Sequence, residues 1–189
     1  MGNDKATLYT RRGDDGTTDL GNKQRVEKSS LRIEVLGTLD ELNSLLGMAV
    51  AHGIPASNQE LLQELQRQLL TLGSELAQAQ KPVTTEGKVH FLEQQLDMLD
   101  RELPPLTGFI LPGGTPAGAT LHLARTVCRR AERRLCRLAD QSGEELNPMA
   151  VPFLNRLSDL LFVLARNVNR AGQRPEQGWT ESPRAGCDE

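Results

Sequence analysis

The stretch from Leu121 to Leu138 has the pattern of a long α-helix that buries one face. Its apolar residues recur at alternating spacings of three and four, which places them in one stripe along the helix. The stripe consists of Leu121, Ala124, Cys128, Ala131, Leu135 and Leu138. Because such a stripe is unfavourable in water, the helix must pack against other elements in a core.

Further stretches of the sequence carry apolar stripes with the same spacing. They comprise Leu39, Leu42, Leu46 and Ala49; Leu62, Leu65, Leu69, Leu72, Leu76 and Ala79; Val89, Leu92, Leu96, Leu99 and Leu103; and Leu154, Leu157, Leu161, Leu164 and Val168. The breaks between stripes are mostly short, and Pro104 and Pro105 end the third of them. This pattern favours an all-α fold, a five-helix antiparallel bundle.

The two ends of the sequence lack any such stripe. Residues 1–30 are rich in glycine and threonine and show neither helical nor strand periodicity, so we expect an irregular N-terminal segment. From residue 172 onward, proline, glycine and charged residues dominate, which predicts a disordered tail at 172–189. The 189 residues are thus expected to form a single domain, with the helical bundle at 31–171.

The helix predicted around 121–138 also carries a dense positive charge. Arg125, Arg129 and Arg133 follow one another in i, i+4 register. Beside them lie Arg130, Arg134 and Arg137, with Glu132 as the one acidic residue of the motif. Like charges at this spacing repel each other, so the helix gains stability from a nearby anion. The guanidinium fork matches phosphate, although a solvated basic face is the alternative.

Composition limits what these arginines are expected to bind. The formal net charge is -3 and aromatic residues make up 3%, which argues against nucleic-acid partners. The sequence contains no apolar run long enough to cross a membrane, so no membrane partner is expected. The cysteines, Cys128, Cys136 and Cys187, show neither zinc-site nor disulfide spacing. These features favour a reducing compartment, the cytosol or an organelle matrix, and we expect a cytoplasmic protein.

Two loops have compositions that suggest ligand contacts. In the segment Thr10–Thr18, Gly13 and Gly16 allow backbone N–H groups to approach an anion, although the spacing is not that of a Walker loop and a plain turn is the alternative. In the segment Phe109–Gly114, large apolar residues precede a turn. They either plug the end of the bundle or face a large, flat apolar ligand.

Several separated motifs occur along the sequence in a defined order. They are TRRGDDG at 10–16, GTLDELNS at 37–44, FILPGG at 109–114, RTVCRRAER at 125–133 and NRLSD at 155–159. Together they resemble the PduO-type ATP:corrinoid adenosyltransferases, and the resemblance extends from about Leu8 to Arg170. It implies a five-helix bundle that forms a homotrimer, with ATP and cob(I)alamin meeting at subunit interfaces.

The implied reaction transfers the 5'-deoxyadenosyl group of ATP to cobalt, which yields adenosylcobalamin and releases triphosphate. Because Co(I) is itself the nucleophile, no general base is needed, and the sequence shows no Ser-His-Asp or paired-acid arrangement. Positioned cations stabilise the negative charge that develops on the leaving triphosphate. We expect Mg²⁺ to be bound by the phosphate oxygens of ATP, with no protein side chain as a metal ligand. A flavoprotein or another reductase is a further implied partner.

The resemblance also implies roles for individual residues. From the N-terminal segment, the residues implied to bind ATP are Thr10, Arg11, Arg12, Gly13, Thr18 and Lys28. From the helices, they are Arg129, Arg130, Glu132, Arg133 and Asn155. The implied catalytic residues are Arg129, Arg133, Phe109, Asp40 and Arg125.

Two of these implied roles concern the corrinoid. Phe109 matches the position that closes the lower face of the corrin ring, and Asp40 and Arg125 match an intersubunit salt bridge. The sequence departs from the family pattern in the nucleotide loop. Arg12 stands where many relatives have a small hydroxyl residue, and Arg11 replaces lysine. The positive charge survives, but a hydroxyl contact at position 12 is lost.

Two other interpretations use the same helices. A non-catalytic carrier or sensor would also bind ATP and a corrinoid, but it would not need cations on the leaving group. A di-metal carboxylate bundle would need Glu-x-x-His pairs, and the predicted stripes contain none. The enzyme is therefore favoured.

Overall fold

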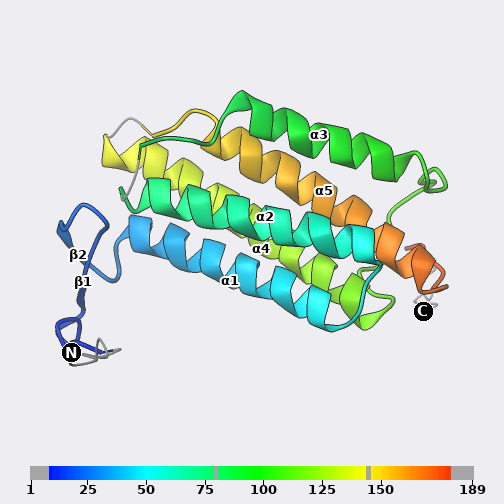
Figure 1. The fold of residues 1–189 in the computed structure, drawn as a ribbon, viewed down its shortest axis with the longest axis horizontal. Helices are drawn as coiled ribbons and strands as arrows, with labels where there is room; N and C mark the ends of the chain where they lie inside the picture. Colours follow the sequence, from blue (N-terminus) through cyan, green and yellow to red (C-terminus); the bar gives the residue numbers. More distant parts are fainter. Residues whose placement is uncertain (1–8, 79–80, 144–145, 180–189) are drawn as a thin grey trace, which may run out of the picture.

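The computed structural model describes residues 9–78, 81–143 and 146–179, and it is dominated by five helices (Figure 1). The helices are α1 (Leu31–Ala51), α2 (Ala56–Leu76), α3 (Glu86–Asp100), α4 (Pro116–Ser142) and α5 (Ala150–Ala171). The predicted all-α helical bundle is confirmed. Among the described residues, no helix is both long and apolar enough to span a membrane.

Helix α4 is longer than its apolar stripe because both of its ends have good capping residues. The side-chain oxygen of Thr115 accepts a hydrogen bond from the Gly118 amide at 2.9 Å, and Pro116 occupies the first turn, where its missing N–H is harmless. At the other end Gly143 adopts φ 62°, a left-handed conformation that glycine tolerates without a Cβ clash.

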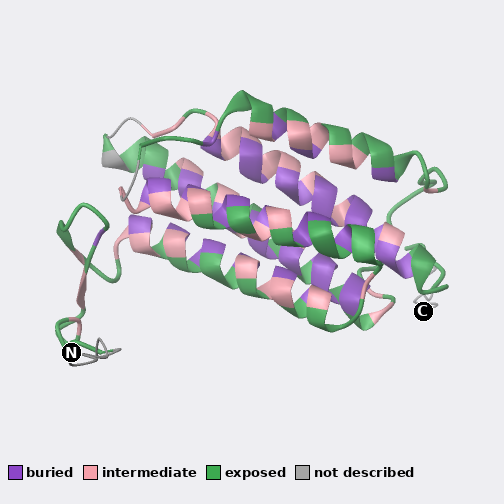
Figure 2. Cartoon of the chain, viewed as in Figure 1, coloured by how far each residue is buried: buried purple, intermediate pink, exposed green. Residues whose placement is uncertain are grey.

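The core lies between α4 and its neighbours. Helix α4 packs against α5 and α1, α2 covers α1, and α3 packs mainly against α5. The apolar stripes face inward, and the outward faces of α2 and α3 are largely exposed (Figure 2). Every residue of the predicted α4 stripe is buried. Burial of these stripes supplies the main driving force for the fold.

One helix pair in the bundle is parallel. Ion pairs join Glu93 to Arg156 and Asp100 to Arg166, so residue numbers rise in the same direction along α3 and α5. Helices α3, α4 and α5 alternate in direction along the chain, so α3 and α5 run parallel to each other. They become neighbours because α3 lies on α5 instead of on α4.

The N-terminal segment is more regular than expected. It contains a short antiparallel hairpin of β1 (Thr17–Asp19) and β2 (Arg25–Glu27). The amide of Gly21, in the hairpin turn, donates to the carbonyl oxygen of Ala77 at 2.8 Å. This contact fixes the hairpin beside the C-terminal end of α2, at the end of the bundle opposite the α3–α4 loop (Figure 1).

The predicted disordered tail does not begin at residue 172. We call residues 174–179 the strap, because they run along the loop that joins α3 to α4. The Leu111 amide donates to the Gln177 carbonyl oxygen and the Trp179 amide donates to the Phe109 carbonyl oxygen, both at 2.8 Å. An isolated β-bridge joins Ile110 to Gly178 between these bonds. Long-range pairing thus orders the strap, and residues 180–189 lie outside the described part of the chain.

Candidate functional site

The arginines of α4 lie in two different environments. On the side facing α1, Arg130 forms an ion pair with Glu41, and Arg134 forms one with Glu34 at 2.9 Å. Arg134 also donates a hydrogen bond to the Thr38 hydroxyl. These two arginines therefore fasten α4 to α1, and acidic residues of the same chain compensate their charge.

The arginine row, which we define as Arg125, Arg129 and Arg133, has no acidic partner within the described residues. The Arg133 guanidinium donates to the backbone carbonyl oxygen of Arg129 at 3.0 Å, which directs the Arg133 side chain along the helix. The Nε atom of Arg125 is buried and has no hydrogen-bond partner among the described residues. Burial, and then the positive charge of Arg129, lower the pKa of Arg125. The negative charge of a bound anion would offset both effects by stabilising the charged guanidinium.

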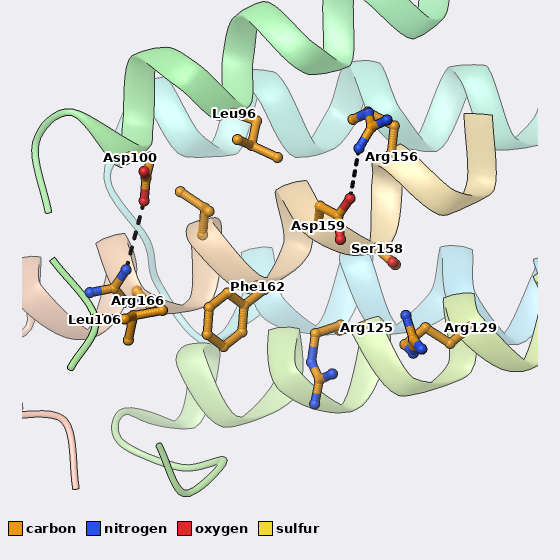
Figure 3. A pocket seen from close by; sticks show the side chains of 11 residues that line it. Leu96, Asp100, Leu106, Arg125, Arg129, Arg156, Ser158, Asp159, Phe162 and Arg166 are labelled. Carbon is orange, nitrogen blue, oxygen red and sulfur yellow. Dashed lines mark hydrogen bonds and ion pairs between the residues drawn. The ribbon is translucent and has the colours of Figure 1, made fainter. Parts of the chain in front are cut away.

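A pocket of about 420 Å³ opens beside this row, between α4, α5 and α3 (Figure 3). The Arg125 guanidinium lies 5.9 Å from the centre of the Phe162 ring, which forms part of the wall. Asp159 also lines the pocket, but it forms an ion pair with Arg156 at 2.9 Å. Its carboxylate is therefore engaged locally, and the pocket presents the cations of α4 to an incoming ligand.

Glu132 and Asn155 lie beside the arginine row and link α4 to α5. The Asn155 amide donates to the Glu132 carboxylate at 2.9 Å. The Cys128 thiol, one turn earlier, donates to the Leu154 carbonyl oxygen at 3.2 Å, and burial raises the pKa of this thiol. The two contacts hold the helices in register, so the sequence-predicted residues Glu132 and Asn155 do lie together next to the arginines.

The N-terminal loop is folded around Gly13. Lys28 donates to the Gly13 carbonyl oxygen at 2.7 Å, and a Cβ atom on Gly13 would lie 3.1 Å from both the Lys28 ammonium and the Thr17 carbonyl oxygen. Asp15 accepts hydrogen bonds from the Thr17 hydroxyl at 2.6 Å and from its amide at 3.0 Å. These two bonds, with help from Arg25, lower the pKa of Asp15.

An ion-pair network that sequence reasoning missed stabilises this loop. Arg25 lies 3.3 Å from Asp15 and from Asp19, and it also donates to the Arg12 carbonyl oxygen. Arg12 in turn pairs with Asp19 at 3.1 Å. Asp19 and Arg25 are cross-strand partners in the hairpin. The sequence pattern that could have predicted this pair is the presence of opposite charges on either side of a turn. Thr10, Arg11 and Arg12 are exposed beside this network, and Thr18 is half-buried in β1.

Phe109 does not plug the end of the bundle. Its side chain is 81% exposed, and its ring meets the edge of the Trp179 ring at a centroid distance of 6.5 Å. Leu111 is also exposed. The alternative of a core plug is therefore wrong for Phe109, and the loop presents an apolar surface to the outside.

Comparisons with known proteins agree with this geometry. The family model described as "Cobalamin adenosyltransferase" matches residues 8–168. A cobalamin adenosyltransferase of Cupriavidus metallidurans is 44% identical over 95% of this chain and 97% of its own length. A corrinoid adenosyltransferase of Bacillus subtilis is 44% identical over 86% of each chain. The chain belongs to the cobalamin adenosyltransferase family.

Solved structures of PduO-type members have the same fold. A Phe-to-His variant of the Lactobacillus reuteri ATP:corrinoid adenosyltransferase, complexed with cobalamin and ATP, superposes with a TM-score of 0.86 at 34% identity. The alignment covers 93% of this chain and 98% of that one. An Arg-to-Lys variant complexed with ATP gives a TM-score of 0.83 at 33% identity, covering 92% and 100% of the two chains. Family membership assigns the chain the activity of a corrinoid adenosyltransferase, and the sequence-based prediction of family and activity is confirmed.

The structure separates two groups of residues that the family resemblance assigns to one site. The N-terminal loop around Gly13 and the Phe109 loop lie at opposite ends of the adenosyltransferase bundle (Figure 1). Within the described residues no ion pair joins Asp40 to Arg125, and Asp40 is exposed on α1. A single copy of the chain therefore does not bring all of the sequence-predicted residues together.

Proposed function

We propose that Arg129 and Arg133, with the pocket beside them, bind the triphosphate of ATP and that the N-terminal loop completes the nucleotide site. The observation that supports this most directly is that Arg129 and Arg133 lie beside a pocket and have no acidic partner among the described residues. Glu132 and Asn155 lie beside these arginines on α4 and α5. Arg130, which pairs with Glu41 on the side facing α1, is included in the proposed ATP site on the family resemblance alone. Thr10, Arg11, Arg12, Gly13, Thr18 and Lys28 are the nucleotide-binding residues proposed for the N-terminal loop.

The chemistry needs charge stabilisation and no proton transfer. A cobalt–carbon bond forms as cob(I)alamin attacks the 5'-carbon of ATP, and the bond from that carbon to the triphosphate oxygen breaks. The electron pair of the broken bond stays on the triphosphate, where Arg129 and Arg133 stabilise it. Arginine suits this role because it is always charged and presents several donors.

Magnesium accompanies ATP in this proposal. The described residues contain no group of three or more His, Cys, Asp or Glu side chains that would hold a metal. We propose that Mg²⁺ binds to the phosphate oxygens of ATP, where it would neutralise part of their charge.

Phe109 is proposed to act on the corrinoid. An exposed aromatic ring placed against the lower face of the corrin excludes water and the cofactor's own base from cobalt. Loss of the axial ligand makes reduction of cob(II)alamin to cob(I)alamin easier. A flavoprotein or another reductase is the proposed electron donor.

Assembly into a homotrimer would unite the separated groups. In this arrangement Asp40 of one subunit pairs with Arg125 of the next, and the N-terminal loop reaches the neighbouring arginine row. Two observations support this: Asp40 is exposed, and the Arg125 Nε atom has no hydrogen-bond partner in the described part of the chain. The unpaired Cys128 and Cys136 agree with a cytoplasmic location.

The decisive experiment supplies ATP, Mg²⁺ and chemically reduced cobalamin to the purified protein. We expect the light-sensitive absorption spectrum of adenosylcobalamin and stoichiometric triphosphate. ATP binding without a cobalt–carbon bond would instead indicate a carrier. Sedimentation or light scattering of the same sample tests the trimer, and a monomer at assay concentration would contradict the shared site.

A further inference from the structure

Arg166 is a buried cation on α5 that lines the pocket beside Arg125 and Arg129, and the proposed reaction assigns it no role. Its side chain is only 2% exposed, yet it has several well-placed partners. Its guanidinium contacts the Glu176 carboxylate at 2.5 and 3.3 Å and donates to the Pro104 carbonyl oxygen at 2.7 Å. Asp100 lies 3.7 Å away (Figure 3). Because an unpaired charge in the protein interior is strongly destabilising, these contacts are needed to compensate the buried guanidinium.

Apart from Asp100 at the end of α3, the partners of Arg166 belong to two segments that adjoin Phe109. Pro104 lies at the start of the loop between α3 and α4, and Glu176 lies in the strap. The strap then forms its two backbone hydrogen bonds to the loop, at Leu111 and at Phe109 itself. One guanidinium thus braces the Phe109 loop from both sides.

Phe109 needs such support because its own packing is sparse. At 81% exposure its ring has little buried contact to fix its orientation, and the loop that carries it is irregular. Its observed ring contact is with Trp179, which the strap places at its edge. Ordering a loop before ligand binding lowers the entropy lost on binding.

We propose that the Arg166–Glu176 ion pair is a clamp that positions Phe109 through the strap, with Trp179 as the side wall. The proposal rests on the proposed role of Phe109 at the corrinoid. Arg166, Glu176 and Trp179 are positioning residues in this scheme. The ion pair orders the strap, the strap pairs with the loop, and the loop then holds the ring ready beneath cobalt.

Trp179 provides a direct test without cobalt, because it is the sole tryptophan of the chain. In Glu176→Ala we expect lower Trp179 fluorescence anisotropy and stronger acrylamide quenching than in the unaltered protein. Gln177→Ala is the matched control, since its side chain is exposed on the same strap and its backbone bond survives. Equal anisotropy in both variants and the unaltered protein would overturn the clamp.

The second test follows the corrinoid. With Glu176→Ala, adenosylation that starts from cob(II)alamin and a weak reductant should slow several-fold, while the KM for ATP stays unchanged. Electron paramagnetic resonance should show a smaller fraction of bound cob(II)alamin without its axial nitrogen ligand. Glu176→Gln keeps an acceptor oxygen and should retain part of both signals. A mobile Trp179 with an unchanged rate and spectrum would refute the positioning role.

A double-mutant cycle separates action through Phe109 from a general defect. If Glu176 acts through Phe109, adding Glu176→Ala to Phe109→Ala should change the rate little further. If the losses in rate of the two single variants add up in the double variant, the proposal is overturned. It is also overturned if the melting temperature of Glu176→Ala falls far enough to account for the lost activity. If the unaltered protein makes no adenosylcobalamin, the proposed function fails. The Trp179 comparison then still decides whether the ion pair orders the strap.

Discussion

Two faces of α4 carry the same residue type in opposite electrostatic settings. Toward α1, Arg130 and Arg134 are matched by acidic side chains and serve packing. On the arginine row, the charge of Arg129 and Arg133 has no such match within the described residues. The difference shows that a high density of arginine on a helix does not by itself identify an anion-binding site. Arginines that lack an acidic partner in the same chain are a better indication of such a site.

The sharpest test of this contrast is removal of a charge from the arginine row. Arg129→Ala or Arg133→Ala removes a charged contact worth about 1.5–3 kcal/mol, which predicts a loss in kcat/KM of roughly 10- to 150-fold. The melting temperature should hold, because both side chains are exposed. Arg137→Ala, one turn beyond Arg133, is the matched control and should be nearly silent. Equal activity in the three variants would mean that the row is only a solvated face.

Charge exchange across the proposed subunit interface should have the next largest effect. Asp40→Arg or Arg125→Asp alone places like charges opposite each other and should weaken both assembly and activity. The double variant restores attraction and should recover part of each. Sedimentation and the adenosylation assay measure the two effects. Additive losses in the double variant would contradict a direct pair.

The opposite face predicts an effect on stability with little effect on catalysis. Arg134 and Glu34 are both partly exposed, and such pairs contribute about 0.2–1 kcal/mol. Arg134→Ala should therefore lower the free energy of unfolding modestly, and a cycle with Glu34→Ala should reveal coupling in that range. Turnover should stay near that of the unaltered protein. A loss comparable to that of Arg129→Ala would erase the distinction between the two faces.

The smallest expected effect is a pH dependence from His122, one turn before Arg125. Burial first, and then the charge of Arg125, lower the pKa of His122 below its ordinary 6.5. As the pH falls below 6.5, His122 therefore takes up a proton more readily in the unfolded chain than in the folded chain. The free energy of unfolding thus decreases as the pH is lowered below 6.5.

Thermal melts at several pH values test this pH dependence. His122→Gln should flatten the acid-induced fall in melting temperature. The exposed His90, whose pKa is raised by its hydrogen bond to Glu93 and by nearby acids, contributes the opposite slope in both proteins. Identical pH profiles for the two proteins would assign the fall in stability to other groups.

The helices and the core were predictable because each stripe is long and strictly periodic. Leu121 and Leu135 are fully buried, as their spacing indicates. The parallel packing of α3 on α5 was not predictable, because a stripe shows which face is buried and not which helix covers it. The hairpin that begins with β1 (Thr17–Asp19) was missed because its three-residue strands are too short to show an alternation of apolar and polar residues.

The site was predictable where a motif lies on one helix and less so where distant segments meet. Sequence reasoning grouped Arg130 with Arg129, because the acidic partner Glu41 lies 89 residues away. It interpreted the strap as disordered, since a polar stretch with no stripe gives no local signal. The order of the strap comes from backbone pairing with the Phe109 loop and from Arg166, and both depend on the tertiary fold.

The one-sided packing of α3 has a consequence for motion. Helix α3 is the shortest of the described helices and packs mainly against α5, with only Val89, Leu92 and Leu99 buried. Local opening is cheapest where few apolar contacts are broken, so α3 should exchange its amide hydrogens before α1, α4 and α5 do. Leu96 and Asp100 of this helix also line the pocket beside Arg125 and Arg129. We therefore expect the α3 wall of that pocket to open locally more often than any other part of the bundle, while the α4 wall stays rigid.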